Sequence, residues 1–493
     1  MRDLEISTGV RVRDGDTLYI EGKWQPADDG RTFDVTDPGT GAVIGRAADA
    51  GAAETERAIA AAGEAFAAWS RETAYRRADV LWAAHALMME RLEDLAALMT
   101  LEQGKPLKAA RNEVRYAADF LSWFAEEAKR VYGGSIPSAR PEQRLTVLHQ
   151  PVGVVAGITP WNYPISMITR KVAPAVAAGC SIVLKPAEQT PLCAVAVFDL
   201  LAEAGLPPGV ANLVTTSRPQ AVGDRLLDAP TVRKLTFTGS TEVGKHLAAR
   251  AAATMKRVSM ELGGHAPMLV FDDADPVHAA KGAALVKFLN TGQACISPNR
   301  IFVQRSILEA FTAELVSRVE RLVAGPGNRP GVSVGPLVDD AALEKVSGQV
   351  EDAVAKGARL LTGGRRLTED GLGAGRFFAP TVLADVDESM RIYREETFGP
   401  VAAIIPFDDE DEGVRRANDT EYGLASYLYT TDLGRAARVS EALRFGIVGV
   451  NDINPTAAAA PFGGIGVSGL GREGGAQGIH EYLDVKLVGL VVP

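Results

Sequence analysis

The chain contains 493 residues, of which 46% are hydrophobic and 23% are charged, values typical of a globular protein with two or three domains. Its formal net charge of −10 and its interspersed acids and bases argue against sequence-independent nucleic-acid binding, which needs a basic surface. The three cysteines, Cys180, Cys193 and Cys295, are too few for a disulfide framework and favour a reducing compartment.

Targeting and metal-binding signals are not found in the sequence. Residues 1–5 lack the basic and apolar pattern of a secretory signal, and no uncharged apolar stretch approaches the ~20 residues that span a bilayer. The six histidines form no HExxH motif and no Cys/His cluster with zinc spacing. We therefore expect a soluble cytoplasmic protein with no metal site, no nucleic-acid partner and no membrane partner.

Helical spacing dominates the first part of the chain. Apolar residues in the segment 52–69 recur on one helical face, and a second long helical region is predicted over 75–131. From residue 152, short apolar runs alternate with helical patterns. The predicted strands span 152–158, 181–185, 232–237 and 258–262, and the predicted helices span 165–178, 192–204 and 241–253. This alternation predicts a parallel sheet covered on both faces, with ligands beyond the carboxyl ends of its strands.

A second alternation of strands and helices begins near Pro267. The predicted strands span 268–271, 301–304 and 446–450, and the predicted helices span 277–288, 307–323 and 341–355. The sequence therefore predicts an α/β protein of two halves, divided near Gly263 and Gly264.

Two predicted strands end in polar residues that are candidates for chemistry. The segment 158–164 follows a buried strand and precedes a helix, and its Asn162 offers an amide donor there; a proline-rich turn with a capping asparagine explains it equally well. Glu261 leaves the strand 258–262. Partial burial would raise its pKa toward that of a general base, whereas a solvent-facing glutamate is the competing interpretation.

One cysteine differs from the other two in its surroundings. Cys295 lies in a polar, glycine-containing loop over 290–300, whereas Cys180 and Cys193 lie in apolar or alanine-rich segments typical of inert core residues. A thiol is nucleophilic only as the thiolate, and the sequence does not fix its pKa. The segment 237–244 joins a strand to a helix, and its glycines would let phosphates approach the helix N-terminus; an ordinary capped helix start explains it as well.

Seven short motifs occur together in one order. They are PWN, KPAEQTP, FTGSTEVG, ELGG, GQxC, EETFGP and PFGG. With them the chain resembles the aldehyde dehydrogenase superfamily over essentially its whole length. The resemblance implies a Rossmann-type parallel-sheet domain, a second α/β catalytic domain and a small β-flap for oligomerisation. The NAD(P)-binding domain would comprise 1–129 and 152–263, the catalytic domain 264–466, and the oligomerisation elements 130–151 and 467–493.

The resemblance also implies roles for the catalytic residues. Cys295 would attack the aldehyde, and the Asn162 amide and the Cys295 N–H would stabilise the oxyanion. After hydride transfer, Glu261 would activate water to hydrolyse the thioester. Lys171 and Glu473 match positions linked to proton relay, with a structural salt bridge as the competing account.

A cofactor site follows from the same resemblance. Lys185 and Glu188 would hold the adenosine ribose, and Glu396 the nicotinamide ribose. The full set implied is Ile158, Thr159, Pro160, Trp161, Lys185, Ala187, Glu188, Gly239, Ser240, Val243, Leu262, Glu396 and Phe398. The Glu188 carboxylate favours a free 2′-hydroxyl and repels a 2′-phosphate, so we expect NAD, although Lys185 could tolerate NADP.

The substrate is less defined by the resemblance. The run 167–171 looks most like the succinate-semialdehyde dehydrogenase branch, in which Arg170 would bind the distal carboxylate; a helix-surface ion pair is the alternative. The chain departs from that branch at Leu289, where a second arginine is expected, and at Ser297, where a second cysteine is expected. The alanine-rich segment 451–460 also replaces a serine-bearing loop. A glutarate or 2-oxoglutarate semialdehyde, or an uncharged aldehyde, therefore stays open as the substrate.

Two other functions compete with hydrolytic oxidation. A CoA-acylating enzyme would not need Glu261, and a catalytically idle relative would not need the set of Cys295, Glu261 and Asn162. The family resemblance further implies a homodimer or homotetramer formed through a β-flap near 130–150 and a C-terminal strand near 481–491. An apolar strand there would need cover.

Overall fold

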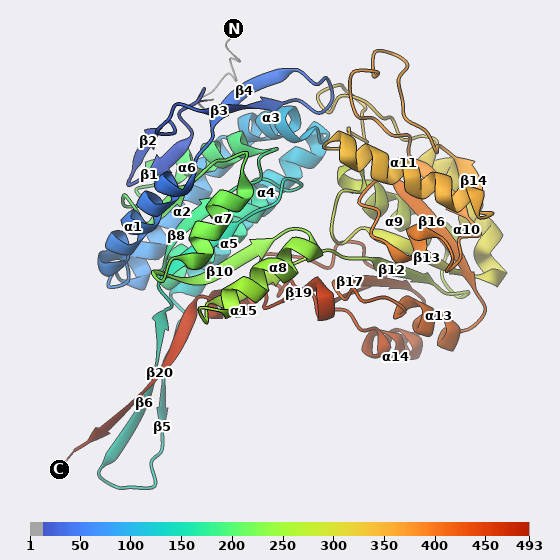
Figure 1. Cartoon of the computed structure of the whole chain (residues 1–493). Helices are drawn as coiled ribbons and strands as arrows, with labels where there is room; N and C mark the ends of the chain where they lie inside the picture. Colours follow the sequence, from blue (N-terminus) through green and yellow to red (C-terminus); the bar gives the residue numbers. More distant parts are fainter. Residues whose placement is uncertain (1–12, 493) are drawn as a thin grey trace.

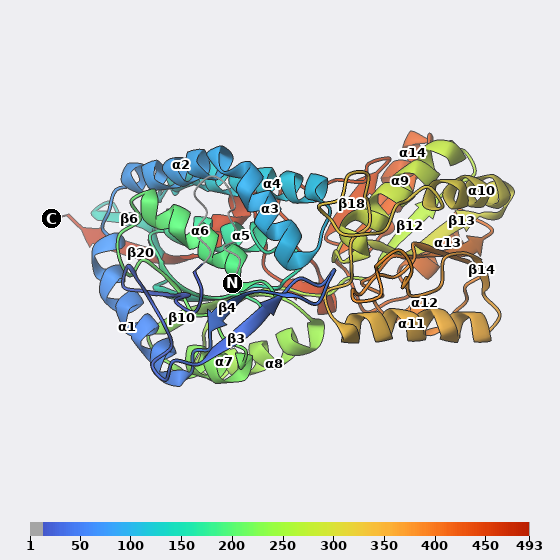
Figure 2. The same ribbon diagram turned by 90° about the horizontal axis from the view of Figure 1, so that it is seen from above.

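A computed structural model describes residues 13–492 of the chain, so the segment 1–5, which lacks the pattern of a secretory signal, lies outside the described residues. Two lobes, each built on its own sheet, lie side by side, and a narrow β-ribbon projects from one of them (Figures 1 and 2). The α/β class predicted from the alternation of strands and helices is confirmed.

The first lobe is built on an eight-stranded sheet with the order β19-β11-β10-β7-β8-β9-β1-β2. Its five central strands are parallel: β7 (Val154–Ile158), β8 (Ser181–Lys185), β9 (Ala211–Leu213), β10 (Val232–Thr238) and β11 (Arg257–Glu261). Antiparallel strands complete the two edges: β1 (Leu18–Ile20), β2 (Lys23–Gln25) and β19 (Gly469–Leu470). The helices of this part are α1 (Ala52–Trp69), α5 (Ser166–Ala178), α6 (Pro191–Glu203), α7 (Pro219–Asp228) and α8 (Thr241–Ala252).

The long helical region predicted over 75–131 is confirmed, and three helices occupy it. They are α2 (Ala74–Glu90), α3 (Leu92–Gln103) and α4 (Leu107–Ala128). Gly104 ends α3 in the left-handed conformation, with φ +88°, and Pro106 then opens the next helix. Apolar spacing continues through such a break, so periodicity alone merges the helices. The sequence patterns also do not reveal the N-terminal strands β1 to β4, of which β3 (Thr32–Thr36) and β4 (Val43–Ala48) form a separate pair.

The second lobe is built on a seven-stranded sheet with the order β14-β15-β16-β13-β12-β17-β18. Its strands are β12 (Ala266–Val270), β13 (Pro298–Gln304), β14 (Arg359–Thr362), β15 (Thr381–Ala384), β16 (Val401–Phe407), β17 (Ala425–Tyr429) and β18 (Ile447–Val450). All pairings are parallel except that of the edge strand β14. Its helices are α9 (Pro276–Phe288), α10 (Leu308–Val319), α11 (Asp340–Ala355), α12 (Arg391–Arg394), α13 (Glu410–Ala417) and α14 (Leu433–Ala442).

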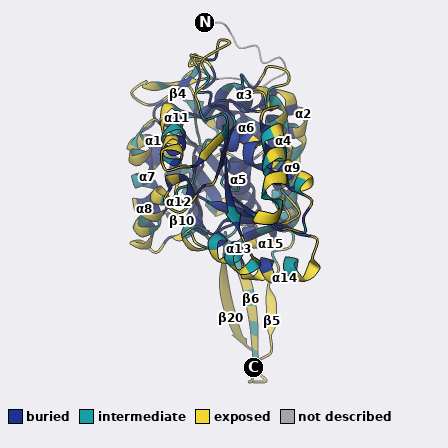
Figure 3. Ribbon diagram, turned by 90° about the vertical axis from the view of Figure 1, so that its right-hand side faces the viewer, coloured by how far each residue is buried: buried dark blue, intermediate teal, exposed yellow. Residues whose placement is uncertain are grey.

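The projecting ribbon has the strand order β20-β6-β5. It comprises β5 (Gly134–Ile136), β6 (Gln143–Pro151) and β20 (Leu483–Val491), and α15 (Gly475–His480) precedes the last of these. β20 pairs with β6 along its whole length, and the ribbon stands away from both lobes with much of its surface exposed (Figure 3). It contains strand segments from both of the ranges predicted for oligomerisation; the exact domain boundaries stay a prediction.

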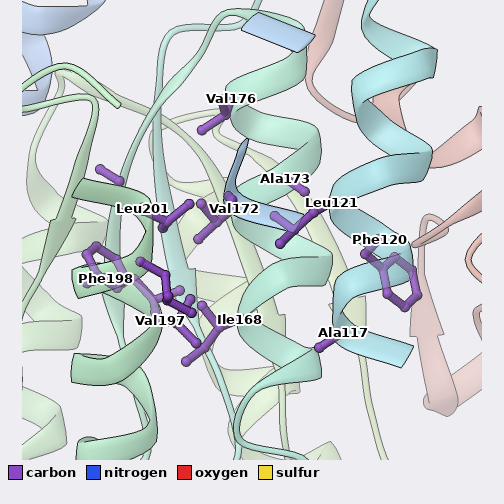
Figure 4. Close-up of a cluster of buried hydrophobic side chains, with 14 of the residues drawn as sticks. Ala117, Phe120, Leu121, Ile168, Val172, Ala173, Val176, Val197, Phe198 and Leu201 are labelled. Carbon is purple, nitrogen blue, oxygen red and sulfur yellow. The ribbon is translucent and has the colours of Figure 1, made fainter. Parts of the chain in front are cut away.

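A dense apolar core fixes the helix that carries the candidate site residues. Side chains of α4, α5 and α6 interdigitate around Phe120, Val172 and Phe198, all of them buried (Figure 4). Every residue of α5 is buried. Burial of each large apolar side chain contributes roughly 1.5–3 kcal/mol, so α5 is held firmly against its neighbours.

Candidate active site

The predicted functional segments meet at one edge of the first sheet. In the register of the strands, Ile158 pairs with Lys185 and with Phe237, and Thr238 pairs with Glu261. The carboxyl ends of these parallel strands therefore present their following loops side by side, which is where ligands bind in open α/β sheets.

The loop that carries Cys295 has an unusual backbone. Asn290 and Thr291 adopt positive φ values of 49° and 62°, and the β-branched Thr291 is a costly residue in that region. The Thr291 hydroxyl compensates by accepting a hydrogen bond from the Gly335 N–H at 2.9 Å. A Cβ at Gly292 would lie 2.1 Å from the Gly399 carbonyl oxygen, so only glycine fits there. The loop is thus fixed by the second lobe.

Cys295 lies on the wall shared by two cavities. The first, of about 270 Å³, is also lined by Ser240, Glu396 and Phe398, and we call it the cofactor-side cavity. The second, of about 370 Å³, is also lined by Arg170, and we call it the substrate-side cavity. Predicted site residues that line the cofactor-side cavity are Pro160, Trp161, Asn162, Gly239, Ser240, Leu262, Cys295, Glu396 and Phe398.

The Asn162 side chain is oriented toward the Cys295 loop. Its Nδ2 donates to the Gln293 carbonyl oxygen at 3.1 Å. A carbonyl only accepts, so this contact identifies the amide nitrogen, and an amide NH₂ keeps a second hydrogen for another acceptor. The Asn162 side chain therefore contacts the Cys295 loop and does not cap α5, whose N-cap is Ile165.

Glu261 is buried, which excludes the interpretation of a solvent-facing glutamate. Neither of its carboxylate oxygens has a hydrogen-bond partner among the described residues. Burial raises the pKa of Glu261 well above its usual range, and the nearby Glu473 carboxylate raises it further. A buried carboxyl group with a raised pKa is suited to proton transfer.

The thiol of Cys295 is partly buried. Burial raises its pKa to about 12, against the opposing effect of the Arg170 charge, so the thiol needs a base to become a nucleophile. Cys180 and Cys193 are fully buried in the core, and burial raises the pKa of the Cys180 thiol to about 11. Their surroundings agree with the prediction of inert core residues.

Arg170 and Lys171 both contact Glu473. Lys171 Nζ lies 2.5 Å from Glu473 Oε1, and Arg170 Nε lies 2.9 Å from Oε2. All three side chains are buried, so Arg170 is not in a helix-surface pair, and two cations share one carboxylate. The Arg170 guanidinium also lies over the Phe462 ring at 4.0 Å, and its Nη2 has no hydrogen-bond partner among the described residues.

The residues expected at the cofactor split into two groups. Ser240 caps α8 by accepting from the Val243 N–H at 3.3 Å, and Glu396 accepts from the Gly264 N–H at 3.0 Å. The predicted residues Ile158, Thr159, Lys185, Ala187, Glu188 and Val243 do not line the cofactor-side cavity; they lie near the ends of β7 and β8 and on the first turn of α8. Lys185 and Glu188 face each other at 3.4 Å.

A dinucleotide fits this arrangement. α8 begins three residues after the end of β10, at the carboxyl edge of the sheet, and the N–H groups of a helix N-terminus suit a pyrophosphate. A Cβ at Gly244 would collide with Leu262 at 2.2 Å, so this glycine lets the helix pack closely on the strand end. The Glu396 carboxylate could hold a hydroxyl of the nicotinamide ribose, and the Glu188 carboxylate could hold a hydroxyl of the adenosine ribose.

Sequence reasoning missed several residues of the substrate-side cavity. Lys105, Glu113 and Asn290 line it, and Lys105 forms a buried ion pair with Glu113. A lysine between two helices carries no signal of burial in the sequence. Leu289 also lines this cavity, where the resemblance expected an arginine.

Membrane spans and metal clusters are both absent from the part of the chain that the structure describes. Within residues 13–492, no helix is both long and apolar enough to cross a membrane. The same residues contain no group of three or more His, Cys, Asp or Glu side chains placed to hold a metal ion.

Comparisons with known proteins show the family of this chain. The model of the aldehyde dehydrogenase family matches residues 24–488. The 3-sulfolactaldehyde dehydrogenase of Pseudomonas putida is 53% identical over 470 residues, which cover 95% of this chain and 96% of the relative. The NADP(+) succinate-semialdehyde dehydrogenase of Escherichia coli is 50% identical over 467 residues, with the same coverage. The crystal structure of succinate-semialdehyde dehydrogenase from Burkholderia pseudomallei superposes with a TM-score of 0.95 at 48% identity and covers 100% of both chains. The predicted membership is confirmed: the chain belongs to the aldehyde dehydrogenase family.

Proposed function

We propose that this protein oxidises an aldehyde to the carboxylic acid with NAD(P)⁺ as the hydride acceptor, through a thioester on Cys295. The observation that carries the proposal is the position of Cys295 on the wall between two cavities. One cavity contains the groups expected at the nicotinamide, and the other contains Arg170. A cofactor in the first and an aldehyde in the second would meet at the sulfur.

The residues divide the reaction between them. The Cys295 sulfur loses its proton to a base and attacks the aldehyde carbon. The Asn162 amide and the Cys295 N–H donate to the resulting oxyanion, and one such donor is worth about 10²–10³ in rate. Bound NAD(P)⁺ supplies the acceptor for the hydride. Glu261 then takes a proton from the water that hydrolyses the thioester, and Lys171 and Glu473 pass protons through the buried site.

We assign the NAD(P)-binding domain to residues 1–129 and 152–263, and the catalytic domain to 264–466. The Glu188 carboxylate favours the free 2′-hydroxyl of NAD, while Lys185 beside it could neutralise a 2′-phosphate. We therefore propose NAD as the preferred cofactor, with NADP also accepted. The family contains a relative named for NADP(+), so both cofactors belong in any assay.

We further propose that the substrate is an ω-semialdehyde, such as succinate semialdehyde. The two relatives at 50–53% identity are named for succinate semialdehyde and 3-sulfolactaldehyde, aldehydes that each carry an acidic group. Arg170 offers the matching charge, because it lines this cavity and its Nη2 has no hydrogen-bond partner among the described residues. Leu289 and Ile453 line the same cavity and favour an aliphatic chain before the acid, so a longer semialdehyde such as that of glutarate also fits.

Substitution of Arg170 by leucine should lower kcat/KM for acidic aldehydes by about 10- to 10²-fold, because an ion pair that binds the substrate is lost. The measurement is NADH or NADPH formation with semialdehydes of increasing chain length, with each cofactor. Neutral aldehydes of matched length are the control and should lose less. An equal loss of kcat/KM for acidic and neutral aldehydes would show that Arg170 does not bind the acidic group of the substrate, because Arg170 would then act only through Glu473.

We propose that the ribbon joins two copies of this chain in a homodimer or a homotetramer. β20 is an edge strand, and its apolar residues Val485, Leu487 and Leu490 are 70%, 62% and 57% exposed. An exposed edge strand with several apolar side chains invites pairing with another strand.

The double substitution Val485→Lys and Leu487→Lys should shift the protein to monomers in sedimentation velocity, because two charges would be buried without partners. Leu433→Lys, at a position 84% exposed on the other lobe, is the matched control and should leave the assembly unchanged. A wild-type protein that sediments as a monomer at micromolar concentration would refute this assembly.

A further inference from the structure

The main-chain carbonyl of Asn162 is held by two donors. Lys105 Nζ donates to it at 2.8 Å and Asn290 Nδ2 at 2.9 Å. This carbonyl belongs to the residue whose side-chain amide faces the Cys295 loop. Because these two donors fix the carbonyl, they also determine where the side-chain amide can point.

Lys105 and Glu113 both contact the turn 162–166. The two side chains form an ion pair, and each is 1% exposed. The Glu113 carboxylate also accepts from the N–H groups of Ile165 at 3.1 Å and Ser166 at 3.2 Å. The pair thus binds the turn 162–166 at both ends, through its first carbonyl and its last two amides. The ammonium of Lys105 also lies over the Tyr163 ring at 4.2 Å.

The same turn is tied to the loop of the nucleophile. Asn162 Nδ2 and Asn290 Nδ2 both donate to the Gln293 carbonyl oxygen, at 3.1 and 3.2 Å. The backbone of Gly104 and Lys105 packs closely against the second lobe. A Cβ at Gly327 would lie 2.4 Å from the Lys105 carbonyl oxygen, and one at Gly335 would lie 2.3 Å from that of Gly104.

We propose that Lys105 is a positioning residue for the oxyanion step, which holds the Asn162 amide at the carbon attacked by Cys295. Its buried ammonium holds the Asn162 carbonyl together with the Asn290 amide, and Glu113 holds that ammonium in place. The inference rests on the proposed function, in which the Asn162 side chain donates to the oxyanion. A misplacement of about 1 Å at such a group costs about 10²-fold in rate.

A purely structural role for the Lys105–Glu113 pair makes a different prediction. A pair that only supports the fold would affect stability and the binding of every ligand alike. The rate loss on removing the pair would then multiply with the rate loss on removing the Asn162 amide. A residue that acts through Asn162 has nothing left to position once that amide is gone. A double-mutant cycle separates the two cases.

The experiment measures the acylation rate as the pre-steady-state burst of NADH, in Lys105→Met, Asn162→Ala and the double variant. Each single variant should slow acylation by about 10²-fold, and the double variant should match Asn162→Ala. Cofactor affinity, from quenching of tryptophan fluorescence, should be unchanged. Multiplicative losses in the double variant would overturn the proposal, as would an unchanged acylation rate in Lys105→Met.

Lys105→Met leaves the Glu113 carboxylate buried and unpaired, which threatens folding. The cycle is therefore repeated with Lys105→Met/Glu113→Gln, because the glutamine oxygen still accepts from Ile165 and Ser166. Lys105→Arg, which keeps a charged donor, should recover part of the rate. Lys356→Met, at an exposed ion pair with Asp352, is the matched control and should retain the wild-type burst. A wild-type protein without a burst on any aldehyde would defeat the proposed function itself, an outcome distinct from multiplicative losses.

Discussion

Replacement of Cys295 by serine should abolish aldehyde oxidation while cofactor binding survives. A serine hydroxyl is a far weaker nucleophile than a thiolate, so we expect a loss on the order of 10⁴-fold or more in kcat. The measurement is NADH formation with an aldehyde that the wild type oxidises, together with a fluorescence titration of NAD⁺.

Cys180→Ser is the control for this substitution. Cys180 is equally a free cysteine, but it is buried in the core, and its sulfur donates to the Tyr482 carbonyl at 3.4 Å, a contact that a serine hydroxyl can reproduce. Its activity should stay near that of the wild type. If Cys295→Ser lost cofactor binding as well, or kept its activity, the assignment of the nucleophile would be wrong.

Local sequence patterns are sufficient to predict the strands that position the site. β7, β8, β10 and β11 are short apolar runs between helical segments, and polar residues follow them where the strands end. Because parallel strands end at one edge of a sheet, the pattern alone predicts that Asn162 and Glu261 lie at the same edge. The polarity of its loop is enough to distinguish Cys295 from Cys180.

Contacts between distant segments cannot be predicted in this way. Lys171 and Glu473 meet across 302 positions of sequence, and no pattern in either segment specifies that they pair through one carboxylate. Lys105 is buried because its ammonium pairs with Glu113 of α4 and donates to the Asn162 carbonyl in the turn before α5. These contacts depend on how segments far apart in the sequence pack together, which periodicity and composition do not encode.

Replacement of Glu261 by glutamine should stop turnover after one cycle. Without a carboxylate to activate water, the thioester on Cys295 would accumulate, and we expect steady-state kcat to fall by about 10²- to 10⁴-fold. Rapid mixing should still show a burst approaching one NADH per active site, because hydride transfer precedes hydrolysis. Mass spectrometry of the trapped protein should show the acyl group on Cys295. A matched Glu188→Gln variant, at the other end of the cofactor site, should keep multiple turnovers.

The pH dependence of deacylation should carry the signature of the same carboxyl group. Burial and the Glu473 charge raise the pKa of Glu261, so its protonated, inactive form persists well above pH 4.5, the ordinary pKa of a glutamate. The deacylation rate should therefore fall as pH decreases through that raised pKa, and this acidic limb should disappear in Glu261→Gln. If CoA restored turnover in the variant and accelerated the wild type, the thioester would pass to CoA rather than to water. Hydrolysis of the thioester with Glu261 as the base would then not be the normal route of deacylation. The position of the buried Glu261 carboxyl group beside Arg170, Lys171 and Glu473 would not change that conclusion.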